Sequence, residues 1–349
     1  MAQPFVSVCV PTYNGNAFLA ETLESIAAQT FDDYEVVIVD DNSTDDTVAI
    51  ARQYAASDPR VRIFAPPERA GSSARNANRC LAYARGEWIK FIFQDDLMAP
   101  DCLAAMLDAT RDGHRFALCW HDYRFEEGVS EETRGWYESL PSLRTAVPGT
   151  YASPGDFCEA VLAHWGKNFL GPTSSSFIHR DCFARHGSFS SENVSFPDLD
   201  CWIRMGQSEG LAIAPSYLVT FRVHATSISA GLRGSRLSDY RSELEFLRFH
   251  LDVASAPAHA RLREHMRAHA PPMDPGELLL KRAKGTRWLA IDARNRHQDP
   301  SLWEKWDGFV RAHPEVAALL READRDEDAP RDAGVVQKLR SRLSAWLRH

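Results

Sequence analysis

The sequence predicts an α/β protein with a Rossmann-like, mostly parallel sheet flanked by helices, followed by a C-terminal helical extension. Apolar, β-branched runs alternate with amphipathic helical patterns over about the first 120 residues, which is the order of a parallel sheet. Paired carboxylates directly follow two of these strands, at the edge where open α/β sheets bind ligands. From residue 238 onward, apolar residues recur at three- and four-residue steps, which indicates helices.

The N-terminal part contains strands and helices joined by short loops. Apolar runs predict strands at residues 5–10, 35–39, 61–64, 88–93 and 116–120. Helical periodicity and capping residues predict helices at 18–30, 47–55, 74–84 and 101–110.

The following part is less regular, and its polar segment 126–149 predicts a long loop. Ser153 and Pro154 start a helix that ends near residue 165. Further strands are predicted at 174–179, 211–214 and 217–222, and helices before Gly187 and at 201–209. The charged segment 321–332 predicts an exposed linker. We divide the chain into 1–235, with halves 1–122 and 123–235, and a helical extension 236–349.

The net charge of −8 argues against nucleic acid as a partner, because binding a polyanion normally requires a basic face. The seven cysteines are odd in number and lack metal-ligand spacing, so we expect reduced thiols in a cytoplasmic protein. No signal peptide or membrane-spanning run is predicted. The basic amphipathic segment 335–349 could dock on the protein itself or on a partner, or lie peripherally on the inner face of an anionic membrane.

Asp95 and Asp96 follow the predicted strand 88–93. Adjacent carboxylates repel each other, so a divalent cation, or the metal of a phosphate-bearing ligand, would explain the pair. The alternative is that one of them caps the helix that starts near Pro100.

Four segments together resemble family 2 of the inverting, nucleotide-sugar-dependent glycosyltransferases, which have the GT-A fold. They are SVCVPTYN at residues 7–14, VIVDDNSTD at 37–45, GSSARN at 71–76 and QDD at 94–96, in the order and spacing of the family. The resemblance covers about residues 4–225. It implies transfer of a sugar from a nucleoside diphosphate, with a preference for uridine, to a hydroxyl-bearing glycan, glycolipid or small molecule, in polysaccharide or glycoconjugate synthesis.

The resemblance also implies a donor site. Asp41 would contact the base, although helix capping and a solvated turn are the alternative for the acidic segment 40–46. Arg75 suits phosphate by its charge and its place near a helix N-terminus, or it forms a surface salt bridge. The other donor-binding residues would be Pro11, Thr12, Tyr13, Asn14, Asn76 and Asp95.

The family's metal motif is usually Asp-X-Asp, and Phe93 occupies its first acidic position here. The resemblance implies that Asp96 reaches Mn²⁺ or Mg²⁺ on the donor diphosphate. His224 matches a family position near the diphosphate, where it would touch metal or phosphate; its alternative is a structural role.

Inversion requires one base that deprotonates the acceptor hydroxyl. Asp198 matches the position of the family's catalytic motif, often Glu-Asp and here Pro-Asp, and we favour it over Asp200. Helix capping is the alternative for both. Acceptor choice would depend on segments 126–149 and 169–174. Trp120, Trp136, Tyr137 and Trp165 are either sugar-stacking platforms or core residues.

Two other functions are alternatives. A non-catalytic nucleotide-sugar sensor or scaffold would explain Phe93 and Pro197. A nicotinamide dehydrogenase is disfavoured, because the first strand leads into Pro-Thr-Tyr-Asn-Gly and not into Gly-x-Gly-x-x-Gly.

Overall fold

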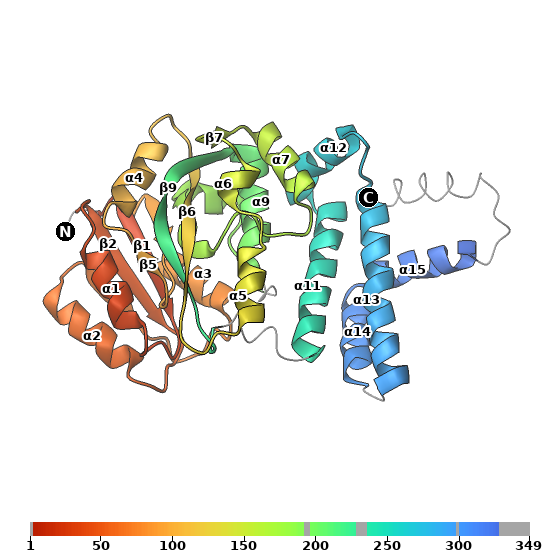
Figure 1. Ribbon diagram of the computed structural model, residues 1–349, viewed down its shortest axis with the longest axis horizontal. Coiled ribbons are helices and arrows are strands. Elements are labelled where there is room, and N and C mark those ends of the chain that lie inside the picture. The colour runs from red at the N-terminus through yellow and green to blue at the C-terminus, as the bar shows by residue number, and fades with distance from the viewer. Residues whose placement is uncertain (1–2, 192–195, 228–235, 298–299, 328–349) are drawn as a thin grey trace. The chain divides into compact units, whose positions relative to one another are not determined.

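The computed structural model describes residues 3–191, 196–227, 236–297 and 300–327. The chain divides into two compact units, Met1–Ala230 and Gly231–His349. The first is built on one nine-stranded sheet with helices packed against it, and the second is helical where it is described (Figure 1). This confirms the predicted fold class. The segment 335–349 lies outside the described residues, and the division of the first unit into donor and acceptor halves stays a prediction.

The sheet has the order β3-β2-β1-β4-β8-β6-β9-β5, and β7 pairs with β9. Strands β3 (Val61–Phe64), β2 (Tyr34–Asp40), β1 (Val6–Thr12) and β4 (Trp88–Phe91) are parallel neighbours, so their carboxyl ends meet at one edge. The sheet is mixed beyond β4, because β8 is antiparallel to both β4 and β6. The remaining strands are β5 (Leu97–Met98), β6 (Phe116–Phe125), β7 (Tyr151–Ala152), β8 (Ser176–His179) and β9 (Leu211–Val223).

The predicted helices of the first unit are present with shifts of a few residues. Helix α7 (Pro154–Ala163) starts as the sequence indicates: Ser153 and Asp156 form a capping box, which satisfies backbone N–H groups at the helix start. The others are α1 (Leu19–Ala27), α2 (Thr47–Ser57), α3 (Ser73–Tyr83), α4 (Cys102–Ala109), α5 (Glu131–Glu138), α6 (Leu143–Ala146), α8 (Arg180–His186), α9 (Pro197–Glu209) and the 3₁₀ turn η1 (Thr173–Ser175).

Segment 126–149 is not the long loop that the sequence predicts, because it contains α5 and α6. Ser130 caps α5 by accepting a hydrogen bond from the Thr133 N–H at 3.1 Å. Tyr137 and Leu143 are buried, and the Tyr137 ring packs against Tyr123 at 5.2 Å. Tertiary burial therefore makes helices of a segment whose polar composition suggested none.

Three strand predictions also need correction. β4 ends at Phe91 and not at residue 93, because the Phe93 N–H is bound by the Ser174 hydroxyl instead of a neighbouring strand. β6 continues to Phe125. The two strands predicted after residue 210 are one strand, β9, whose pairing with β6 is irregular where Pro215, which has no N–H, interrupts the ladder.

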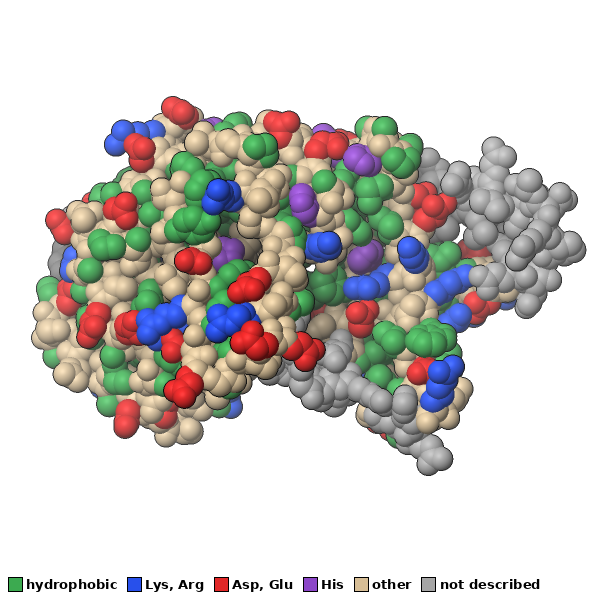
Figure 2. All heavy atoms as spheres, in the orientation of Figure 1, with side chains coloured by type: hydrophobic (Ala, Val, Ile, Leu, Met, Phe, Trp, Pro, Cys, Tyr) green, Lys and Arg blue, Asp and Glu red, His purple; other side chains and the backbone are tan. Residues whose placement is uncertain are grey.

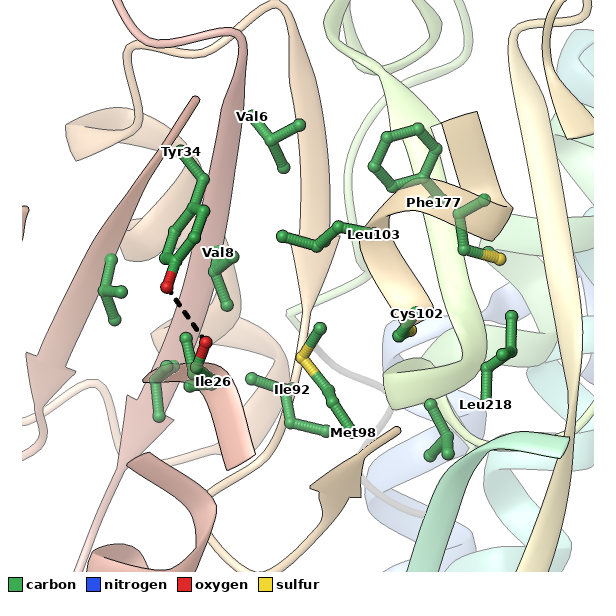
Figure 3. Packing of buried hydrophobic residues seen from close by; sticks show 14 of the residues in the cluster. Val6, Val8, Ile26, Tyr34, Ile92, Met98, Cys102, Leu103, Phe177 and Leu218 are labelled. Atoms are coloured by element: carbon green, nitrogen blue, oxygen red, sulfur yellow. Dashed lines mark hydrogen bonds between the residues drawn. The ribbon is translucent and has the colours of Figure 1, made fainter. Parts of the chain in front are cut away.

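The core of the first unit anchors the segment that carries the two carboxylates. Ile92 and Met98, which flank it in the chain, are both buried in one hydrophobic cluster with Val8 and Leu103 (Figure 3). All seven cysteines lie in the described part of the chain, and they are buried thiols without a disulfide bond. The segment 93–97 is therefore held at both ends by packed side chains.

The second unit contains α11 (Arg236–Ser255), α12 (Ala260–Ala268), α13 (Pro275–His297), α14 (Ser301–Ala312), α15 (Pro314–Glu327) and the 3₁₀ turn η2 (Pro257–His259). The predicted charged linker at 321–332 is wrong up to residue 327, because buried Val316, Leu320 and Ala323 extend α15. Within the described ranges, no helix combines the length and apolarity needed to cross a membrane. Figure 2 shows acidic and basic side chains interspersed over the visible face of the first unit.

Candidate active site

The loops after β1 and β4 are joined by the Gln94 side chain. Its Oε1 accepts a hydrogen bond from the Tyr13 N–H at 2.8 Å, and its Nε2 donates to the Tyr13 carbonyl at 2.9 Å. Gly15 makes room for this pairing, because a Cβ there would lie 2.2 Å from Gln94 Oε1. The Pro-Thr-Tyr-Asn-Gly loop and the Gln-Asp-Asp segment are thus one hydrogen-bonded structure.

The loop after β2 is attached to the same structure. Asn14, in the left-handed region at φ 46°, accepts a hydrogen bond from the Thr44 N–H at 2.8 Å through its side chain. Asp40 accepts hydrogen bonds from the Thr12 hydroxyl at 3.0 Å and from the Ser43 N–H at 2.8 Å. The side chains of Thr12, Asn14 and Asp40 therefore hold the loops together.

Asp41 and Tyr13 flank the edge of this structure. The buried Asp41 carboxylate accepts hydrogen bonds from the Ala70 and Gly71 N–H groups, the second at 2.9 Å, and lies 3.2 Å from the Arg79 guanidinium. The Tyr13 ring is 39% exposed, with the Arg69 guanidinium 4.2 Å from its centroid. Asp41 orders the loop before α3, and Tyr13 offers a ring face to a ligand.

The two predicted residues on α3 have different surroundings. Arg75 is exposed in the first turn of the helix, and its side chain forms no ion pair with a described residue. Asn76 is buried, and its amide donates to the Val39 carbonyl at 2.9 Å and to the Thr12 carbonyl at 3.2 Å. Asn76 thus braces β1 against β2 through its amide nitrogen, and its contact with the donor stays a prediction.

Asp96 is buried, and protein groups occupy both of its oxygens. One oxygen accepts a hydrogen bond from the Ser174 hydroxyl, and the other accepts one from the Arg222 N–H at 3.1 Å. Burial, and then the neighbouring Asp95 charge, raise the pKa of Asp96 well above its ordinary value. The Asp96 oxygens are thus held by protein groups, and the role of Asp96 as the metal ligand stays a prediction.

Asp95 is the more accessible carboxylate, with 22% of its side chain exposed. Its Oδ2 lies 3.1 Å from His224 Nε2, while His224 Nδ1 lies 2.9 Å from the Thr226 hydroxyl. Carboxylate oxygen and imidazole nitrogen are suitable ligands for Mn²⁺. Among the residues that the structure describes, no group of three or more potential ligand side chains forms a metal site by itself. A metal here would therefore need oxygens from a diphosphate or from water, as Mg²⁺ commonly does.

Arg222 fixes the backbone beneath these carboxylates. Its side-chain Nε donates to the Asp95 carbonyl at 2.9 Å, and its guanidinium forms an ion pair with Glu21 at 2.7 Å. Arg222 is only 3% exposed, and the ion pair with Glu21 compensates its charge. Arg222 therefore contacts both residues, the side chain of Asp96 through its N–H and the carbonyl of Asp95 through its Nε.

Asp198 lies in the first turn of α9, which starts at Pro197 and not at residue 201 as predicted. Its oxygens accept hydrogen bonds from the Leu199 N–H at 2.9 Å and from the Thr173 hydroxyl at 3.2 Å. Burial raises the pKa of Asp198 to about 6. Asp200, in contrast, forms an ion pair with Arg204 at 2.9 Å, one helical turn away. Asp198 therefore suits proton transfer near neutral pH better than Asp200 does.

The family model described as glycosyl transferase family 2 matches residues 7–168. The chain contains a family 2 glycosyltransferase domain.

Known glycosyltransferases are similar in sequence to part of this chain. A GalNAc(5)-diNAcBac-PP-undecaprenol beta-1,3-glucosyltransferase of Campylobacter jejuni is 32% identical over 33% of this chain and 38% of its own length. Among solved structures, S. aureus TarS 1-349 in complex with UDP has a TM-score of 0.57 at 18% identity, covering 90% of this chain and 83% of that one. The mannosyltransferase PcManGT from Pyrobaculum calidifontis, in complex with GDP-Man and Mn²⁺, has a TM-score of 0.50 at 20% identity, covering 92% and 88%. These structures establish the GT-A fold of the family 2 domain.

Sequence reasoning missed four residues that organise this domain's site: Gln94, Lys90, Thr173 and Arg222. The only sequence signal for Gln94 was its place beside the two carboxylates. Thr173 lies in segment 169–174, which was assigned to the acceptor. Lys90 and Arg222 lie within apolar runs of the sequence, and a single charged residue in such a run is unusual.

We expect Gly15→Ala to lower the free energy of unfolding by about 1–3 kcal/mol, because Gln94 must leave Tyr13 and its hydrogen bonds are lost. Urea unfolding measures this. Gly135→Ala is the control, since open space surrounds that helical glycine and the change should be neutral or stabilising. The Gly15→Ala/Gln94→Ala double variant should be as stable as Gln94→Ala alone; additive losses would contradict the argument.

Proposed function

We propose that this protein is a metal-dependent, inverting glycosyltransferase that moves a sugar from a UDP-linked donor to a hydroxyl acceptor. The observation that carries the proposal is the arrangement around η1. In that turn Thr173 contacts Asp198, and the next residue, Ser174, contacts Asp96 beside the candidate metal ligand Asp95. A base and a diphosphate site on two sides of one turn are what inverting transfer requires.

For the donor, Tyr13 supplies an exposed ring face on which the base can stack. Asp41 and the loop before α3, which it holds, would lie at the edge of the base. Arg75 offers its charge to phosphate from the first turn of α3, where the helix dipole also favours an anion. Asp95 and His224 would hold Mn²⁺ or Mg²⁺. When bound, the ion would stabilise the negative charge on the departing nucleoside diphosphate.

For the transfer, Asp198 takes the proton from the acceptor hydroxyl. A carboxylate with a pKa of about 6 is mostly ionised at neutral pH and remains basic enough to accept a proton. We expect the rate to fall as pH drops below about 6.

The acceptor would be a glycan, glycolipid or small molecule with a free hydroxyl, in polysaccharide or glycoconjugate synthesis. Of the four aromatic residues predicted as possible sugar-stacking platforms, Trp136 is 38% exposed, whereas Tyr137 is buried. Tyr217, at 52% exposed, is a further platform that packs beside Trp120. The Campylobacter jejuni relative, whose name describes a glucosyltransferase for a lipid-linked glycan, supports this class of acceptor.

Calorimetric titration with UDP, GDP, CDP and dTDP, each with and without Mn²⁺, tests the donor class. We expect UDP to bind most tightly and only weakly without metal. Equal binding of all four nucleotides, or no dependence on Mn²⁺, would contradict this proposal. A sensor without activity would bind the nucleotide in the same way but release no UDP from a UDP-sugar over time.

A further inference from the structure

Lys90 is a charged residue without exposed surface. It lies in the central strand β4, between Val8 of β1 and Phe177 of β8. Removing an ammonium group from water costs several kcal/mol. A protein with an apolar side chain of similar size at such a position is often as stable or more stable. The presence of a hydrogen-bond donor at this buried position therefore calls for an explanation in the groups that it contacts.

The Lys90 Nζ donates a hydrogen bond to the carbonyl of Ser174, in the 3₁₀ turn η1. From the other side, the Ser174 hydroxyl donates to Asp96 and accepts from the Phe93 N–H at 3.1 Å. The preceding residue, Thr173, donates its hydroxyl to Asp198 at 3.2 Å. Lys90 thus binds the backbone of the turn whose two side chains reach the two carboxylate regions.

We propose that Lys90 is a positioning residue for the transfer reaction, holding η1 so that Thr173 stays bonded to Asp198 while Ser174 stays bonded to the segment carrying Asp95. The inference rests on the proposed function. Because Lys90 is fully buried, it acts through the turn and not on the substrate. Misplacing a reacting group by about 1 Å can cost roughly 100-fold in rate, so a buried brace can matter as much as a contact residue.

Three variants separate this role from simple support of the fold. Lys90→Met removes the donor and keeps an unbranched side chain one atom shorter. Lys90→Gln is also one atom shorter but keeps a donor without the charge. Ile89→Met is the control, because Ile89 is the neighbouring buried residue of β4 and its aliphatic side chain forms no hydrogen bond.

The first readout does not depend on activity. The pKa of Asp198 is obtained by comparing urea unfolding across pH for each variant with the same variant carrying Asp198→Asn. Losing the Thr173 hydroxyl bond should move this pKa upward by about half a unit in Lys90→Met. Lys90→Gln and Ile89→Met should keep the wild-type value. An unchanged pKa in Lys90→Met, or an equal shift in Ile89→Met, would overturn the inference.

If Lys90→Met does not fold, Thr173→Val takes its place, because it removes the hydroxyl and retains the shape. The same upward shift is expected, and the double variant Lys90→Gln/Thr173→Val should shift no further than Thr173→Val alone. No shift in Thr173→Val would refute the path through the turn.

The second readout is the release of UDP from a UDP-sugar in the presence of Mn²⁺. We expect kcat to fall about 10- to 100-fold in Lys90→Met, while the Kd for UDP changes less than about threefold. An unchanged kcat in a folded Lys90→Met protein would overturn the positioning role. If wild type releases no UDP, the proposed function fails, and the unfolding experiment still decides whether Lys90 positions Asp198.

Discussion

Asp198→Asn is expected to lower kcat by about 10²- to 10⁴-fold and, at the same time, to stabilise the protein. The asparagine amide cannot take a proton from the acceptor, although it keeps the shape of the side chain. Donor binding should change little, because Tyr13, Asp41 and Arg75 do not depend on this carboxylate. Turnover assays and UDP titration measure the two effects separately.

The gain in stability follows from the raised pKa. Burial raises the pKa of Asp198 from 3.8 to about 6, so between these values the folded protein binds the proton more tightly than the unfolded chain. Stability therefore falls as pH rises through this window, and the full loss is present above pH 6. Asparagine avoids this loss, and we expect a gain of about 1–3 kcal/mol at pH 7.5 in urea unfolding.

At pH values below about 4 the gain should disappear, because Asp198 is then neutral in both states. Asp200→Asn is the matched control: it breaks the ion pair with Arg204 in the same helix and should cost stability at pH 7.5. If Asp198→Asn gained equal stability at pH 7.5 and below about pH 4, titration of Asp198 would be ruled out as the cause. Unchanged turnover in Asp198→Asn would remove it as the base.

Asp95→Asn is expected to weaken Mn²⁺-dependent binding of UDP by about 100-fold or more, because a neutral amide replaces an anionic ligand. His224→Ala should weaken it by about 10- to 100-fold. In the absence of metal, both variants should bind UDP as wild type does. Calorimetry with and without Mn²⁺ measures this difference.

Asp96→Asn is the decisive control for the metal assignment. Its buried side chain is held by Ser174 and Arg222, and burial raises its pKa, which favours the neutral form. We expect it to keep Mn²⁺-dependent binding within about threefold of wild type. Loss of metal dependence in Asp96→Asn, with retention in Asp95→Asn, would restore the assignment that the sequence suggested.

Much of the fold could be predicted because its signals are local. Alternation of β-branched runs and amphipathic segments predicted β1 to β4 and α1 to α4, since each element buries one face or both. The sequence did not predict the helices α5 and α6, because they depend on the burial of Tyr137 and Leu143, and Tyr137 packs against Tyr123 and Phe221 of two strands. Nothing local in a polar segment records that contact.

The candidate site divides in the same way. Strand ends and motif spacing predicted the loops that meet at the sheet edge, and the family resemblance implied Asp198 as the base. They could not distinguish Asp95 from Asp96, because adjacent residues in a tight segment point in different directions and the sequence leaves open which one is buried. The bracing role of Asn76 could not be predicted for a similar reason, since it depends on two carbonyls of other segments, those of Thr12 and Val39.

The sequence by itself determined the α/β class, the family resemblance and the order of the loops at the sheet edge, because these follow from periodicity and from short motifs. The tertiary structure decided which carboxylates are exposed, how Gln94 joins two loops, and where the charge of Lys90 acts. Arg222 lies 126 positions from Asp96, and Ser174 lies 84 positions from Lys90. Contacts over such separations arise only when the strands pack, so no local pattern encodes them.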